Sequence, residues 1–272
     1  MKTLVNFILY SNLWIALASV CFCLEGLLLH DSKIDFWYLC FLFCGTMIIY
    51  NGHRIIGFKL FVNDTQSKRF ESLIILKPWI YALLAISVIL GSISIYHIRM
   101  MLSNWILIAL LISVLYITPV LRNNRLRDLP YIKVFLIALC WTLLCYLIPT
   151  ENPDTYILIE RFCFMMAITI PFDIRDLESD SKSGTLTIVS KLGKKWSRFI
   201  AILFAVIGFY CLVSSPIMDF TISTLVGYVF IYVLTILLIS GSNENSADHY
   251  YSGYLDGLLV IRILPIILTI IL

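Results

Sequence analysis

The chain has 272 residues, of which 60% are hydrophobic and 14% are charged, and its formal net charge is +3. So small a net charge gives no indication of nucleic-acid binding. Apolar runs of about 20 residues, the length that crosses a bilayer, recur along the chain and leave no room for a long soluble domain. Residues 1–272 are therefore predicted to form a single all-α, multi-pass membrane domain surrounded by membrane lipids.

These apolar runs predict nine transmembrane helices. They cover residues 4–29, 36–56, 73–96, 101–119, 131–149, 155–172, 199–214, 217–240 and 254–272. The first run is too long for a signal peptide and lacks a clean cleavage site, so we expect it to remain as a membrane helix. Its polar residues Asn6, Asn12 and Glu25 are expected to face the interior of the bundle.

Basic residues gather in and beside the loops after the second, fourth and sixth runs, whereas the opposite loops hold only Lys33, Arg99 and Arg161. Excess Lys and Arg mark cytoplasmic loops, so the N-terminus is also predicted to be cytoplasmic. We expect an integral protein of a bacterial inner (plasma) membrane. The basic residues behind this orientation are Arg54, Lys59, Lys68, Arg69, Lys77, Arg122, Arg125, Arg127, Lys133, Arg175, Lys182, Lys191, Lys194, Lys195 and Arg198.

A patch of acidic residues follows the sixth run. Asp173, Asp176 and Asp180 are spaced i, i+3 and i+7, so a continuous helix would project all three from one face. Three oxygen donors in register suit a hard cation such as Mg²⁺, which bridges carboxylates to substrate phosphates. An acidic helix cap is the alternative, but a cap does not need three acids in register.

The basic loops lie on the same predicted side of the membrane as these acids. Membrane orientation explains most of the basic residues, but some of them are expected to converge on an anionic substrate. Arg175 and Lys182 are candidates, because they flank the acidic residues. Carboxylates and bases together are what a complex of Mg²⁺ with a diphosphate requires.

Residues 171–180, with the sequence PFDIRDLESD, and residues 184–187, GTLT, resemble the second aspartate-rich motif of the UbiA-type intramembrane prenyltransferases. Residues 115–122, LYITPVLR, together with the later Lys133, are similar to the Tyr–Pro–basic segment that follows the family's fourth helix. A weaker likeness is the Asp256–Gly257 pair in the last run. The helix count agrees with the family.

The first aspartate-rich motif of that family is altered in this chain. Asn51 matches its leading asparagine, but Gly52 and Ile55 stand where the carboxylates are expected. Arg54 is a permanent cation with a planar fork that binds phosphate oxygens, and we expect it to supply the charge that the missing half of the metal site would have provided. Membrane orientation explains Arg54 equally well.

The resemblance implies a UbiA-like bundle of nine transmembrane helices with a central cavity open near the cytoplasmic side. It implies an enzyme that uses Mg²⁺ to transfer a prenyl group from a prenyl diphosphate to a lipid-soluble or aromatic acceptor. Asp173, Asp176 and Asp180 are the expected catalytic and metal-binding residues. The residues expected to bind the substrate are Asn51, Arg54, Tyr116, Arg122, Arg175 and Lys182.

Two other functions stay open: a related terpene cyclase or lyase, and a non-catalytic lipid-binding protein derived from the family. The altered first motif favours the binding protein, whereas the acidic residues of the second motif favour an enzyme. The sequence does not indicate the oligomeric state.

The predicted orientation can be tested by cysteine accessibility. Single cysteines that replace Lys68 and Lys194 should both react with a membrane-impermeant reagent applied from the cytoplasmic side, because both positions lie in basic loops. Labelling of the two positions from opposite sides of the membrane would contradict the nine-helix topology.

Overall fold

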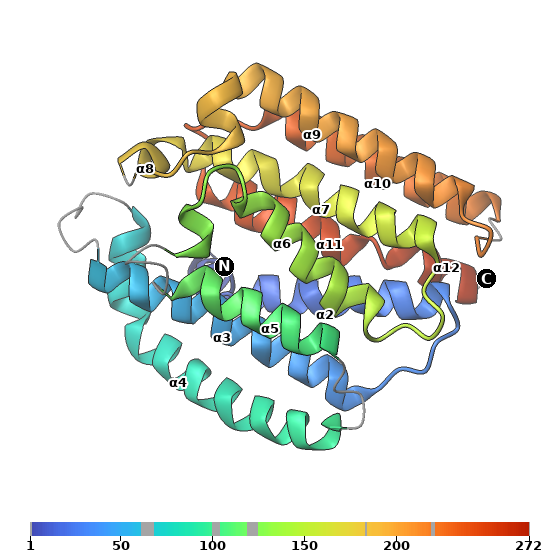
Figure 1. Ribbon diagram of the computed structural model, residues 1–272, viewed down its shortest axis with the longest axis horizontal. Coiled ribbons are helices and arrows are strands. Elements are labelled where there is room, and N and C mark those ends of the chain that lie inside the picture. The colour runs from blue at the N-terminus through green and yellow to red at the C-terminus, as the bar shows by residue number, and fades with distance from the viewer. Residues whose placement is uncertain are drawn as a thin grey trace.

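The computed structural model describes residues 2–60, 68–99, 104–118, 125–182, 184–218 and 221–271. Within these ranges the regular secondary structure is entirely helical. Figure 1 shows the helices running largely side by side, with α4 along one edge of the bundle, α9 and α10 along the opposite edge, and α5, α6 and α7 between them.

The helices fall in the apolar runs of the sequence. In chain order they are α1 (Lys2–Tyr10), α2 (Leu13–Leu29), α3 (Phe36–Leu60), α4 (Lys68–His97), α5 (Asn104–Ile117), the 3₁₀ turn η2 (Leu126–Asp128), α6 (Lys133–Thr142), the π-helix η3 (Leu143–Leu147), α7 (Thr155–Arg175), α8 (Leu177–Lys182), α9 (Ile188–Ser214), α10 (Ile222–Gly241), the π-helix η4 (Tyr250–Leu255), α11 (Asp256–Ile261) and α12 (Leu264–Ile271).

Every run predicted to cross the membrane contains a helix. By length and hydropathy, four helical segments of the described chain qualify as spans, or five if a bent pair near the N-terminus counts as one. The outer helices also expose large apolar side chains such as Trp79, Ile89 and Phe230, as expected of surfaces that face lipid. The all-helical membrane fold is thus confirmed, while the number of nine transmembrane helices stays a prediction.

The first predicted span is not one straight helix. Its axis bends by 67° between Leu4–Tyr10 and Leu13–Leu29. Asn12 lies at the bend with a left-handed φ of 64°, a conformation that asparagine tolerates better than most residues. The prediction of a continuous helix over residues 4–29 is therefore wrong, because one polar residue ends the first segment.

The helix that carries the acidic residues also ends earlier than expected. α7 ends at Arg175, and Asp176 is its C-cap with φ −88° and ψ 5°. A separate short helix, α8, then carries Asp180. The premise that all three aspartates share one continuous helix is therefore wrong.

A closed set of charges lies in the interior. Glu25 of α2, Glu160 and Arg161 of α7, and Arg262, which follows α11, all have 0% exposure. Arg262 Nε lies 3.0 Å from Glu25 Oε2, its Nη2 lies 2.8 Å from Glu160 Oε1, and Arg161 donates to Glu25. Two acids and two bases thus compensate one another, as buried charges must. We call these four residues the buried charge cluster.

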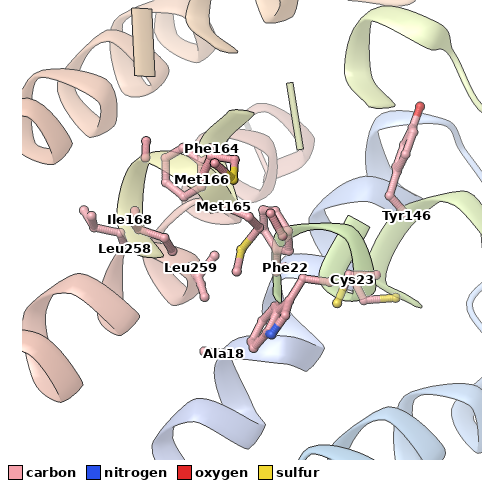
Figure 2. Close-up of a cluster of buried hydrophobic side chains, with 14 of the residues drawn as sticks. Ala18, Phe22, Cys23, Tyr146, Phe164, Met165, Met166, Ile168, Leu258 and Leu259 are labelled. Atoms are coloured by element: carbon pink, nitrogen blue, oxygen red, sulfur yellow. The ribbon is translucent and has the colours of Figure 1, made fainter. Parts of the chain in front are cut away.

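Tyrosines and phenylalanines complete this cluster. Tyr228 of α10 donates to Glu25 over 2.9 Å, and Tyr232 donates to Glu160. The Arg262 guanidinium lies 4.1 Å from the ring centroid of Phe164, and that of Arg161 lies 4.5 Å from the Phe22 centroid. Figure 2 shows Phe22 and Phe164 among the apolar side chains of the surrounding core. The cluster therefore links α2, α7, α10 and the segment after α11.

The position of Arg161 corrects one step of the sequence argument. Its basic side chain was assigned to an outer loop, yet it is fully buried on α7. The predicted orientation does not depend on Arg161. Without it, the loops on the non-cytoplasmic side hold even fewer basic residues, and the three basic loops still mark the cytoplasmic side.

Glu25→Ala should lower the free energy of unfolding by about 3–5 kcal/mol, because it leaves buried arginine charge uncompensated. Denaturant or thermal unfolding of the purified protein in detergent measures this change. The matched control is Glu178→Ala, which removes an exposed pair with Lys182 at 3.0 Å and should cost at most about 1 kcal/mol. Equal losses in both variants would contradict the structural role of the cluster.

Candidate functional site

A cavity of about 470 Å³ opens among the helices, within the size range of small-molecule sites. Side chains of α1, α2, α3, α5, η2, α6, η3, α7, η4 and α11 line it. Part of its wall is charged, with four basic and three acidic residues: Arg54, Arg127, Lys133, Arg175, Asp173, Asp176 and Asp256. Elsewhere the wall is largely apolar or aromatic, with residues such as Ile15, Phe41, Leu42, Ile137, Trp141 and Met165.

Lys133 lies among the three aspartates predicted to bind metal. Its Nζ is 2.8 Å from Asp173 Oδ1, 3.0 Å from Asp180 Oδ2 and 4.0 Å from Asp176 Oδ2. The bond to Asp180 is a hydrogen bond, whereas the closer approach to Asp173 is an ion pair without hydrogen-bond alignment. Although the helix ends at Asp176, the three carboxylates do converge, as their register in the sequence indicated.

Arg175 holds the outermost of these carboxylates. Its Nε and Nη2 donate to the two oxygens of Asp176 over 2.7 and 3.1 Å, a bidentate pairing. The guanidinium lies 4.7 Å from the ring centroid of Phe172 and 5.3 Å from that of Tyr251. Arg175 therefore lines the cavity in a fixed orientation.

Arg54 connects the cavity to the bend in the first span. Its guanidinium donates to the backbone carbonyl of Tyr10 and, over 3.0 Å, to the side-chain oxygen of Asn12. Asn51, one helical turn earlier, accepts from Asn12 over 2.8 Å and donates to the carbonyl of Ser11 over 3.2 Å. These bonds satisfy polar groups that the break between α1 and α2 would otherwise leave unpaired.

Arg127 of η2 lines another part of the charged wall. Its guanidinium contacts His53 Nε2 and lies 5.4 Å from the ring centroid of Tyr116. Its Nε is buried and has no hydrogen-bond partner within the protein. A buried N–H without a partner is costly, so this one is a candidate to bind a ligand oxygen.

The cavity brings together only part of the predicted site. Asp173, Asp176, Arg54, Tyr116 and Arg175 line it. Two predicted residues are buried behind the lining, Asn51 at the helix bend and Asp180 against Lys133. Lys182 is 59% exposed, pairs with Glu178 and does not line the cavity. Arg122 lies outside the described residues.

Four further charged or histidine side chains of the lining are absent from the predicted site residues: His53, Arg127, Lys133 and Asp256. Lys133 and Asp256 belong to segments that resemble the family, but the sequence gives neither a role in the site, and Arg127 is explained by membrane orientation alone. One feature of the sequence did distinguish Lys133, because it opens a long apolar run and an ionisable residue there points to function. No comparable signal marked Arg127, which follows other arginines in a loop.

The carboxylates suit Mg²⁺ in their chemistry but not in their arrangement. Oxygen ligands of this kind are those that Mg²⁺ prefers. In the described part of the chain, however, no group of three or more His, Cys, Asp or Glu side chains is placed to hold a metal ion. The ammonium of Lys133 lies between Asp173 and Asp180. As arranged, these side chains do not form a site for Mg²⁺.

No protein-family model and no curated protein matches the sequence. Solved structures do match the fold. A UbiA homologue from Archaeoglobus fulgidus bound to GPP and Mg²⁺ matches with a TM-score of 0.63 and 13% identity over 98% of this chain and 100% of that one. A second structure of a UbiA homologue from the same organism matches with a TM-score of 0.64 and 14% identity, again over 98% of this chain and 100% of that one. A digeranylgeranylglyceryl phosphate synthase matches with a TM-score of 0.54 and 19% identity over 98% of both chains. These matches confirm, for the fold, the resemblance seen in the sequence.

Arg54→Ala should lower the free energy of unfolding by about 1.5–3 kcal/mol, because hydrogen bonds from a charged donor to Tyr10 and Asn12 are lost. Arg54→Lys should recover part of this, since one ammonium can serve one of the two acceptors. Thermal unfolding of the two variants measures the effect. An unaltered stability of Arg54→Ala would show that Arg54 does not stabilise the helix bend.

Proposed function

We propose that this chain, which has the fold of UbiA-type intramembrane prenyltransferases, binds a prenyl diphosphate in its cavity and transfers the prenyl group to a hydrophobic acceptor within the membrane. The observation that carries the proposal is a cavity that joins a charged wall, with four basic and three acidic side chains, to an apolar chamber. A UbiA homologue of the same fold binds GPP, a prenyl diphosphate. A lipid-soluble or aromatic acceptor is the class of molecule that such a chamber suits.

The diphosphate belongs at the charged wall. Arg127 is a planar cation of the kind that binds phosphate oxygens, and it lines the cavity. Arg54 adds positive charge to the same wall, with its Nη atoms already donating to Tyr10 and Asn12. The unpartnered Nε of Arg127 supplies a donor that the protein itself does not use. Following the predicted orientation, this wall faces the cytoplasm, where a water-soluble diphosphate would be released.

The prenyl chain belongs in the apolar chamber. When the bond between its first carbon and the diphosphate oxygen breaks, the electron pair leaves with the diphosphate, and the cationic wall stabilises the charge that develops there. The remaining allylic cation needs a dry space and aromatic faces. Tyr50, Tyr116, Trp141 and Phe172 line the cavity and supply such faces. The acceptor then donates an electron pair to the cation, forming the new bond, and the proton that it loses passes to the released diphosphate or to water.

Mg²⁺ dependence is a separate part of the prediction. Mg²⁺ accompanies GPP in the solved UbiA homologue. Asp173, Asp176 and Asp180 are the residues expected to hold it in this chain, and the position of Lys133 stands against a preformed site. No step of the proposed reaction is therefore assigned to Mg²⁺, and its requirement stays a prediction.

Non-catalytic binding of a prenyl lipid is the second candidate function. Gly52 and Ile55 replace the carboxylates of the family's first motif, and an ammonium occupies the centre of the second. A protein that only binds such a lipid needs the cavity but not the machinery that breaks the bond. A cyclase or lyase of the same fold differs from the transferase and from the binding protein, because it releases diphosphate even when no acceptor is present.

Purified protein incubated with radiolabelled prenyl diphosphates should release diphosphate only when membrane extract supplies an acceptor, and the label should appear in a larger hydrophobic product. Release without extract would instead indicate a lyase or cyclase. Tight binding without release would indicate the non-catalytic protein, and no binding at all would refute the proposal.

A pair of variants tests the placement of the diphosphate. Arg127→Gln should weaken prenyl diphosphate binding about 10-fold or more, because a charged hydrogen-bond donor is lost from the cavity. Lys182→Gln removes the same charge from an exposed side chain outside the cavity and should leave the affinity unchanged. Equilibrium binding of a labelled prenyl diphosphate measures both, and a larger effect of Lys182→Gln would move the site to α8.

A further inference from the structure

We propose that Lys133 acts as a built-in cation at the three aspartates, so that this chain holds its diphosphate without a divalent metal ion. The identity of the anion rests on the proposed function. The exclusion of metal by Lys133 does not, because it follows from the contacts of Lys133 alone.

The position of Lys133 is the first argument. Its Nζ lies 2.8 Å from Asp173 Oδ1 and 3.0 Å from Asp180 Oδ2, and the residue is only 7% exposed. A metal ion on the same oxygens would meet the ammonium at contact distance, and two cations repel each other strongly in so buried a place. Lys133 opens α6 and its ammonium is held by two carboxylates, so a metal ion at these oxygens would have to displace it.

The charge balance is the second argument. Asp173, Asp176 and Asp180 carry three negative charges, and Lys133 and the bidentate Arg175 offset two of them. Three negative and two positive charges leave the acidic group with one net negative charge instead of three. A bare set of three carboxylates would attract a divalent cation far more strongly than this compensated one does.

The charged wall near Arg54 is the third argument. Where carboxylates of a first motif are expected, the chain has Gly52 and Ile55, with Arg54 between them. Arg54 and Arg127 line the cavity, and the buried Nε of Arg127 lacks a partner within the protein. These two arginines therefore supply positive charge without an added ion, while Lys133 occupies the place that a metal ion would take among the aspartates.

Two measurements on the full-length protein in detergent test this inference. The first is Mn²⁺ uptake, followed by the loss of the free-ion signal in electron paramagnetic resonance. Wild type and Lys133→Arg should take up no Mn²⁺ at the site, because both keep the cation. Lys133→Gln should bind one Mn²⁺ about 10-fold or more tightly than wild type, because the Asp173 and Asp180 carboxylates lose their cation and become available as ligands.

The second measurement is the binding of inorganic pyrophosphate in EDTA and in Mg²⁺. Wild type should bind pyrophosphate in EDTA and in Mg²⁺ with affinities that agree within about threefold. Lys133→Gln should lose about 10-fold or more of its affinity in EDTA and regain it in Mg²⁺, because metal then replaces the missing ammonium.

Wild-type uptake of Mn²⁺ as tight as that of Lys133→Gln would overturn the inference, and so would wild-type pyrophosphate binding that disappears in EDTA and returns with Mg²⁺. Should Lys133→Gln fail to fold, uptake of one Mn²⁺ per wild-type protein, or wild-type pyrophosphate binding that requires Mg²⁺, would still overturn the inference. Failure of pyrophosphate to bind in either buffer would refute the proposed substrate, whereas metal exclusion would still be judged by the Mn²⁺ titration.

Discussion

Ion pairing between buried side chains is the constraint on which this bundle depends, because a charge among apolar helices is tolerated only beside an opposite charge. The buried charge cluster joins helices far apart in the sequence and has no opening to the cavity. The group around Lys133 uses the same kind of contact at the wall of the cavity. One set of pairs thus stabilises the packing, and the other lies at the wall of the cavity that we propose binds an anion.

Hydropathy was enough to locate the helices, since a membrane span needs a long apolar run and little else. The convergence of Asp173, Asp176 and Asp180 was also predictable, because residues three and seven apart return to the same side even though the helix ends at Asp176. Glu25 was correctly expected to face the interior, since a carboxylate in an apolar helix has nowhere else to find a partner.

What the sequence did not reveal depends on pairing across the bundle. The partners of Lys133 and Arg161 were not predicted, because nothing local in the sequence shows that they come from other segments of the chain. The bend at Asn12 was missed for a similar reason: asparagine within an apolar run is unremarkable until Arg54 and Asn51 supply the bonds that stabilise the break. Spacing along one helix predicts which residues lie on the same face of that helix, but not which side chain of another helix contacts them.

The buried charge cluster also bears on how the protein responds to membrane voltage. Moving one elementary charge across 100 mV is worth about 2.3 kcal/mol. The two acids and two bases of the cluster sum to no net charge, and their contacts hold them together at one depth. Small shifts of the cluster as a unit therefore cost almost no electrical work, so its packing should be the same in an energised membrane as in a depolarised one.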